Sequence, residues 1–294
     1  MTATRTVLGW IFIAIMVVGV IYAALSPTLQ PIVFPKVQIP GFNQGTGVSD
    51  HYNLIKNANV SQNVNYIELN ATVKFGAISV VFSDNSDVAV EAKFDRGENT
   101  SALATSQTTE NQVLHVNVYG EAGSLNLTLG KSFQYSGSLN LRIGGITTQL
   151  NQNANLSKLE THIEYIGGIA VDVHSGASFE QLDLAVDLGG IVLNIDADHI
   201  VKDAAINMNT NIGGASIGVN VNTAQIGASL EGTVDIGGIT INNNQFTGTS
   251  SNTQCSLKTT NYQSADKKID IKTKIGLGGI TLQPTTQTIP GFSA

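Results

Sequence analysis

The sequence predicts an all-β protein, a β-solenoid-like stack of Gly-Gly-Ile repeats of about 23 residues, preceded by one N-terminal transmembrane helix. Three observations predict this fold. Gly-Gly pairs recur at a nearly constant spacing, apolar and polar residues alternate around them, and an uncharged apolar run lies near the start of the chain. The composition agrees, because 13% charged residues and 30 glycines among 294 residues are typical of a turn-rich β protein rather than a helical bundle.

The apolar run covers residues 6–25, after a short tail of residues 1–5. Twenty uncharged residues span the hydrocarbon core of a bilayer as a helix, at about 1.5 Å per residue. Arg5 precedes the run and the next basic residue is Lys36, which favours a cytoplasmic N-terminus. A cleaved secretory signal is the alternative, although the apolar part of such signals is shorter, about 7–15 residues. We therefore expect a single-pass cell-membrane protein with an extracellular C-terminal domain, and the lipid bilayer as its first partner.

Residues 26–56 read as an extended, semi-rigid stalk that holds the next domain clear of the lipid headgroups. The reason is their proline content, at Pro27, Pro31, Pro35 and Pro40. A donated strand at Val33–Ile39 would instead permit self-association into a filament, although Pro35 weakens that reading.

The predicted repeat domain covers residues 57–283, and residues 284–294 form a C-terminal tail. The first five Gly-Gly pairs are 23, 22, 24 and 24 residues apart, and a weaker copy, Phe75–Ile78, lies 68 residues before the first of them, close to three further periods. Stacked units of this kind bury a continuous core, so we expect roughly ten coils in a rod on the order of 50 Å long. The predicted repeat corners are Gly144, Gly145, Gly167, Gly168, Gly189, Gly190, Gly213, Gly214, Gly237, Gly238, Gly278 and Gly279.

The alternation around each pair predicts what the glycines do. Near the third pair the apolar residues are even-numbered up to Leu188 and odd-numbered from Ile191 onward. An unbroken strand would turn one of these halves inside out, so the glycines must form a bulge or corner. In this frame the apolar residue before a pair points inward, as at Ile143, Leu188, Ile212, Ile236 and Leu277.

The copy at Gly167 departs from this frame. Alignment with the other copies would point Glu160, His162 and Glu164 inward, and one extra residue restores the apolar frame. The alternative is a buried Glu-His pair suited to acid-base chemistry, but no third group orients it. Residues 97–112 and 242–263 break the period with polar residues and are predicted to be surface loops, the second containing Cys255 as an incidental free thiol.

Several of these segments also resemble a known family. Phe75-Gly-Ala-Ile-Ser-Val-Val-Phe, Asp87-Val-Ala-Val-Glu-Ala, Val113-Leu-His-Val-Asn-Val and the repeated Gly-Gly-Ile units are similar to the bacterial and archaeal "putative adhesin", or toast-rack, domains. The resemblance covers about Val60 to Leu282, and it departs from many members in having Gly-Gly where they have Gly-Asp. It implies a membrane-attached β-solenoid-like module, some relatives of which are envelope-stress regulators, and it implies no catalytic residues.

No recognisable catalytic or phosphate-binding motif occurs, so we expect no enzyme activity, no cofactor and no metal site. Asp196-Ala-Asp198-His199 is the one local group of potential ligands. We interpret it as a solvated turn, with calcium at the turn as the alternative. The net charge of −7 argues against nucleic acid as a partner.

The charge is unevenly distributed along the chain. Residues 140–250 hold three basic and eleven acidic residues, whereas residues 251–294 hold five lysines and two aspartates. These lysines predict a basic interaction patch, for an anionic surface polymer or the acidic face of another copy, unless they only keep sheet edges soluble. They are Lys258, Lys267, Lys268, Lys272 and Lys274.

The sequence therefore favours a non-catalytic, membrane-anchored structural or adhesive module at the cell surface that binds surface polysaccharide. The alternative is an envelope-stress regulatory membrane protein whose solenoid binds partner proteins, although five residues before the membrane segment leave little with which to signal.

Overall fold

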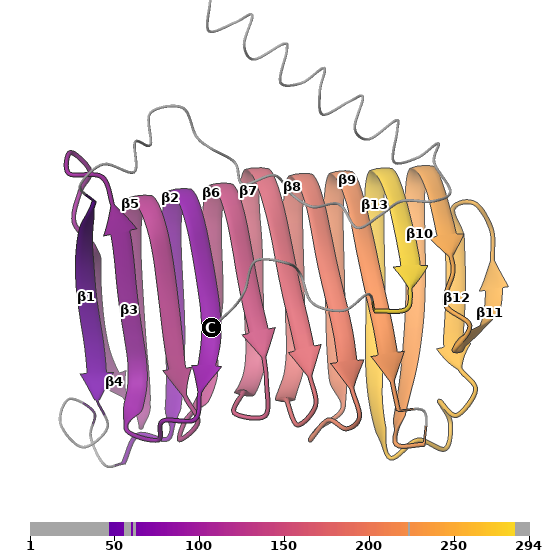
Figure 1. Cartoon of the computed structure of the whole chain (residues 1–294), viewed down its shortest axis with the longest axis horizontal. Coiled ribbons are helices and arrows are strands. Elements are labelled where there is room, and N and C mark those ends of the chain that lie inside the picture. Colours follow the sequence, from indigo (N-terminus) through magenta and orange to yellow (C-terminus); the bar gives the residue numbers. More distant parts are fainter. Residues whose placement is uncertain (1–46, 56–59, 61–62, 223, 286–294) are drawn as a thin grey trace, which may run out of the picture.

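Figure 1 shows a computed structural model that describes residues 47–55, 60, 63–222 and 224–285. Thirteen strands form one sheet, and the described residues contain no helix, so the all-β prediction is confirmed. The strands are β1 (Val48–Ile55), β2 (Tyr66–Ser83), β3 (Val88–Arg96), β4 (Ala104–Glu110), β5 (Val113–Gly130), β6 (Gln134–Leu150), β7 (Asn155–His174), β8 (Ser178–Ala197), β9 (Ala204–Val221), β10 (Ile226–Ile241), β11 (Phe246–Ser250), β12 (Gln254–Thr259) and β13 (Lys267–Gln283).

Eight of the described strands are 16 to 20 residues long and bend near their middle, so that their two halves lie in two facing layers (Figure 1). They stack in parallel, in the order β5-β2-β6-β7-β8-β9-β13-β10. All bends lie along one edge of the molecule, and turns join the strands at the opposite edge. Each bent strand is therefore one coil of a flattened solenoid.

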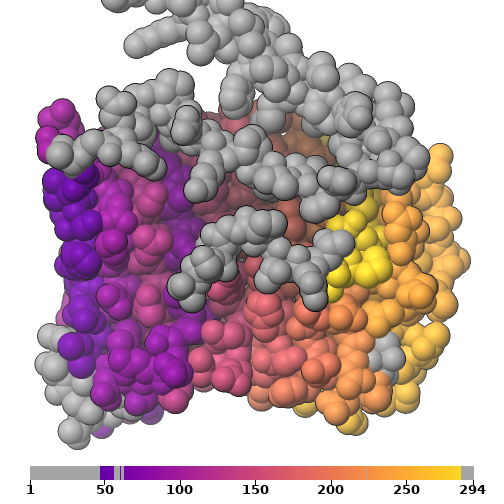
Figure 2. Space-filling view, in the orientation of Figure 1, coloured from indigo at the N-terminus to yellow at the C-terminus, as the bar shows by residue number. Residues whose placement is uncertain are grey.

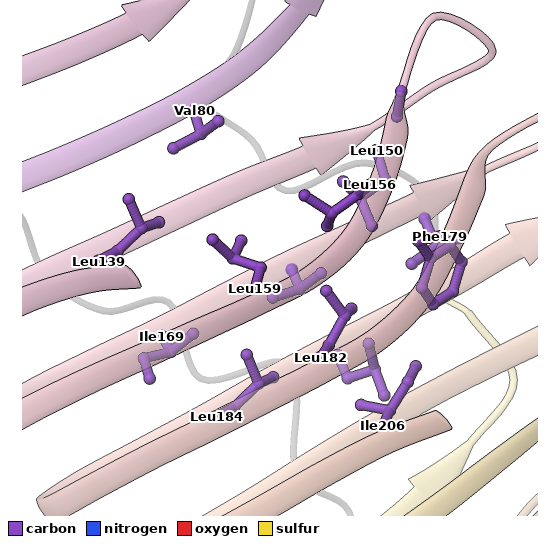
Figure 3. Close-up of a cluster of buried hydrophobic side chains, with 14 of the residues drawn as sticks. Val80, Leu139, Leu150, Leu156, Leu159, Ile169, Phe179, Leu182, Leu184 and Ile206 are labelled. Atoms are coloured by element: carbon purple, nitrogen blue, oxygen red, sulfur yellow. The ribbon is translucent and has the colours of Figure 1, made fainter. Parts of the chain in front are cut away.

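The core lies between the two layers. Along β8, alternate residues on both sides of the bend are buried, as the period-two pattern predicts. Figure 3 shows side chains from neighbouring coils, Leu139, Leu159 and Leu182 among them, gathered in this interior. Each such residue fills only part of the gap between layers, so a continuous core needs several coils.

The glycine pairs form the bends. The first glycine of each pair aligns with that of the next coil, and Gly144 has a φ of 139° in the region that L side chains avoid. A Cβ on Gly144 would lie 1.8 Å from the carbonyl oxygen of Gly76 on the adjacent coil. The aligned column runs through Gly123, Gly76, Gly144, Gly167, Gly189, Gly213, Gly278 and Gly237. The second glycines align in the next row, at Gly145, Gly168, Gly190, Gly214, Gly279 and Gly238.

The prediction that the apolar residue before each pair points inward is wrong. Ile212 is 42% exposed, Leu277 43% and Ile236 67%. Ile143, Ile166 and Leu188 are half-buried, so none of the six residues before a pair lies in the core. The bend that begins at this residue turns its side chain away from the interior. We call the resulting row the corner ridge; it consists of Phe75, Ile143, Ile166, Leu188, Ile212, Leu277 and Ile236.

The extra residue predicted in the Gly167 copy is present. The register of β7 with β8 shifts between Ile163 and Ile166, and this bulge keeps Leu159 and Ile163 buried. Glu160 and His162 are exposed, so they do not form the buried pair considered as an alternative.

The coils do not follow the order of the sequence, which corrects the estimate of ten. The strand β2 lies between β5 and β6, and β13 lies between β9 and β10. In Figure 2 the yellow surface of β13 accordingly borders the orange surface of β10. Gly76 therefore neighbours Gly144 directly, and the 68 residues between them contain an excursion through β3, β4 and β5 rather than three coils.

Both ends of the stack carry short antiparallel strands in segments predicted to lack them. The β4 strand lies within the predicted loop 97–112, while β11 and β12 lie within the predicted loop 242–263. Short polar strands of this kind pair with an edge strand of the stack without continuing the repeat. The sequence pattern therefore gives little indication of them. The β1 strand lies within the range predicted as stalk, so the folded region begins before residue 57. The segment predicted to cross the membrane, residues 6–25, lies outside the described residues, among which there is no membrane-spanning helix.

A partly buried ion pair fastens β1 to the stack. Asp50 Oδ2 accepts hydrogen bonds from Arg96 Nε at 2.7 Å and from the backbone N–H of Leu103 at 2.8 Å. The guanidinium of Arg96 and the Leu103 N–H hold the pKa of Asp50 below its usual value.

We therefore expect acid to loosen β1. A carboxyl whose pKa is lower in the folded state stabilises the fold above its unfolded pKa, and this contribution is lost as the pH falls through the folded pKa. Hydrogen exchange of Val48–Ile55, corrected for intrinsic rates, is expected to be faster at about pH 3 than at about pH 6. The Asp50→Asn variant should lose this difference, and an equal pH dependence in both proteins would contradict the assignment.

Candidate ligand-binding cleft

A cleft of about 650 Å³ lies on the outer surface of the first halves of β9, β13 and β10, where the hairpin of β11 and β12 borders it. Alternate residues of β13 face inward at Ile271, Thr273 and Ile275, which leaves Lys272 and Lys274 exposed between them. The parallel register places Lys272 between Asn207 and Glu231, and Lys274 between Asn209 and Thr233. Thr249, Ser250, Ser251, Gln254 and Ser256 contribute hydroxyl and amide groups from the hairpin.

The two cleft lysines are the free cations of this surface. Neither Lys272 nor Lys274 forms an ion pair with any described residue. Glu231 is the one carboxylate among the residues that line the cleft. Ammonium, amide and hydroxyl groups around one hollow are suited to carboxylate or phosphate oxygens and to sugar hydroxyls.

A second group of the predicted basic patch surrounds Tyr262. The Lys258 and Lys268 ammonium groups lie 4.8 Å and 5.5 Å from the centroid of its ring. The Tyr262 hydroxyl donates to Asp270 Oδ1, which also accepts from Ser229, and burial followed by this carboxylate raises the pKa of Tyr262. These contacts hold the two lysines against the protein.

The predicted patch is therefore divided. Lys272 and Lys274 line the cleft, Lys258 and Lys268 flank Tyr262, and Lys267 begins β13 at the turn edge, where its N–H donates to the Gln225 carbonyl. Whether any of them binds a partner stays a prediction.

The outer faces also carry rungs of carboxylate and amide side chains on adjacent coils. Asn207 Nδ2, for example, donates to Asp183 Oδ1 at 2.8 Å. Equivalent pairs, at 2.8–2.9 Å, are Asn194 with Asp172, Asn211 with Asp187, and Asn220 with Asp196. These pairs are 22 to 24 residues apart, which equals the repeat period, so a search for Asp and Asn at that spacing would have found them.

Two groups singled out in the sequence have structural surroundings. Asp196 accepts from Asn220, and the Asp198 N–H donates to Ser175 Oγ at 2.7 Å; no three metal-ligating side chains come together among the described residues. Cys255 is buried on β12 rather than exposed in a loop, and burial raises the pKa of its thiol.

No family model and no curated protein matches the chain. Among solved structures, a "putative cell adhesion protein" from Clostridium sporogenes is similar, with a TM-score of 0.56 and 14% identity over 82% of this chain and all of the other. At this identity the likeness concerns the fold. "Putative adhesin" structures from Bacteroides fragilis and Parabacteroides merdae match at 9% and 12% identity, covering 81% and 82% of this chain and 97% and 98% of theirs, with TM-scores of 0.27 and 0.28.

Proposed function

We propose that this chain is a non-catalytic adhesive module, anchored to the cell membrane through residues 6–25, that binds an anionic polymer outside the cell through the cleft. The observation that carries the proposal is the pair of lysines without an ion-pair partner among the described residues, Lys272 and Lys274, set among amide and hydroxyl groups on the sheet. The fold shared with the Clostridium sporogenes protein supports an adhesive role. A flat, repetitive surface beside the cleft also suits a repetitive ligand such as a surface polysaccharide.

Charge reversal in the cleft tests the proposal. The Lys272→Glu variant is expected to bind a uronic-acid polymer at least about tenfold more weakly than the unchanged chain, because one attractive contact becomes repulsive. Binding of the full chain in mild detergent is measured by biolayer interferometry at several salt concentrations, and added salt should weaken it.

The matched control is Lys131→Glu, which makes the same charge change at an exposed turn away from the cleft. It should bind like the unchanged chain, and uncharged dextran should bind to none of them. Equal weakening in both variants would show a general charge effect and contradict a cleft site.

The regulatory alternative predicts another partner, an envelope protein. A pull-down from envelope fractions distinguishes the two functions, since adhesion recovers polysaccharide whereas regulation recovers a histidine kinase or a transporter.

A further inference from the structure

The corner ridge is an apolar row outside the buried core, in which Phe75, Ile212, Leu277 and Ile236 are exposed and the other three residues are half-buried. Consecutive coils align its seven residues as direct strand partners, from Phe75 next to Ile143 through to Leu277 next to Ile236. Over six strand steps of about 4.8 Å, the row is about 29 Å long. Aqueous exposure of aligned large apolar side chains is unfavourable, so the row is suited to contact with an apolar or interfacial partner.

The described chain begins at the end of this same edge. Val48 pairs with Arg96, and Arg96 pairs with Gly123 of the glycine column, so β1 starts in line with the bends (Figure 1). The residues that precede it in sequence include the twenty-residue apolar run 6–25. A lipid-anchored chain therefore enters the domain at the edge that carries the ridge.

Aromatic and basic side chains accompany the ridge along β5, β2, β6 and β7. The Lys74 ammonium lies 5.8 Å from the ring centroid of Tyr119, and the Arg142 guanidinium lies 5.3 Å from that of Tyr165. Tyr119 is 38% and Tyr165 47% exposed. Tyrosine rings and long basic side chains are the groups that settle at the boundary between lipid headgroups and acyl chains.

We propose that the corner ridge rests on the surface of the lipid bilayer, so that the domain lies with its bent edge against the membrane. A row one side chain wide falls far short of the roughly 800 Å² per partner that a stable protein interface buries, which disfavours a second copy as the occupant. A planar lipid surface fits a straight row and needs no matching pocket.

The charges beside the ridge indicate which lipid headgroup it should contact. The row just before it contains Lys74 and Arg142 but also Glu121, Asp187 and Asp235. The two cations are paired, Lys74 with Glu121 and Arg142 with Glu164. No net positive charge is left to attract anionic lipid, so contact should occur on zwitterionic phosphatidylcholine and be insensitive to salt.

Lipid quenching of a single tryptophan tests the contact. The full chain with Trp10→Phe carries either Ile212→Trp on the ridge or Val201→Trp at the opposite, turn edge, and is reconstituted in phosphatidylcholine vesicles with brominated acyl chains. Val201 is the matched control, because it is also an exposed aliphatic residue, at 51%. Both proteins share the same anchor, so only the orientation of the domain separates them.

The Ile212→Trp protein is expected to lose at least half of its fluorescence relative to vesicles without bromine, and the Val201→Trp protein almost none. Equal quenching of the two, or none in either, in chains that float with the vesicles overturns the ridge contact and leaves the anchor intact. Failure of the chain to float instead contradicts the anchor of the proposed function, on which this inference rests, and overturns both. Far-UV circular dichroism of both variants must match that of the parent chain. The cleft plays no part in this measurement, so the outcome is independent of polymer binding.

Discussion

The Gly144→Ala variant is expected to be destabilised by more than about 4 kcal/mol, which exceeds the effect of most single substitutions. The new Cβ would lie 1.8 Å from the Gly76 carbonyl oxygen, and the φ of 139° is strained for any residue with a side chain. A backbone carbonyl in a paired strand cannot move aside without shifting the neighbouring coil. Urea unfolding followed by far-UV circular dichroism measures the loss.

The neighbouring Gly145 provides the control. A Cβ there would meet only the Gly168 carbonyl oxygen at 3.9 Å, an ordinary contact, so Gly145→Ala should change the free energy of unfolding by less than about 1 kcal/mol. If Gly144→Ala fails to fold while Gly145→Ala folds normally, the explanation stands. Similar stabilities for the two variants would mean that the bend does not depend on the close approach of adjacent coils.

Tyr135→Phe is expected to destabilise the protein by about 1–3 kcal/mol through the loss of a single oxygen atom. The Tyr135 side chain is buried, and its hydroxyl donates toward two carbonyl oxygens, that of Ala89 at 2.7 Å and that of Gly130 at 2.8 Å. Burial raises the pKa of this hydroxyl, so it remains a donor across the working pH range. Thermal and urea unfolding should both register the change.

Tyr66→Phe is the corresponding control, since the Tyr66 hydroxyl contacts Ser157 Oγ at 2.6 Å in a part-buried site where water can replace it. Tyr66→Phe should lower the free energy of unfolding by less than about 1 kcal/mol. A larger loss from Tyr66→Phe than from Tyr135→Phe would contradict a stabilising role for the buried bonds that join Tyr135 on β6 to β3 and to the end of β5.

The sequence predicted the coil itself well, because its determinants are local. Alternation at Leu182, Leu184 and Val186 specifies a strand, and glycine pairs at a change of parity specify a bend. The direction of the residue just before the glycines could not be read in the same way. Its side chain turns outward because the bend begins there. The alternation of inward and outward side chains holds only along a straight strand, so it does not predict this direction.

The order of the coils could not be predicted from spacing. A parallel strand pairs with whichever coil lies beside it in space, and sequence distance does not specify that neighbour. The same limit applies to the cleft. Lys272 and Lys274 were identified from local charge, but Asn207 and Glu231 flank Lys272 only because β13 lies between β9 and β10.

The position of β13 also has a consequence for how the molecule assembles. The strands β9 and β10 follow each other in sequence, yet they leave room for a strand that is synthesised after both. During synthesis β10 cannot pair as in the final fold when it leaves the ribosome, because its neighbour β13 has not yet been made. The stack is therefore complete only after β13, Lys267–Gln283, has inserted between β9 and β10. Until then the facing edges of β9 and β10 are unpaired and exposed to aggregation.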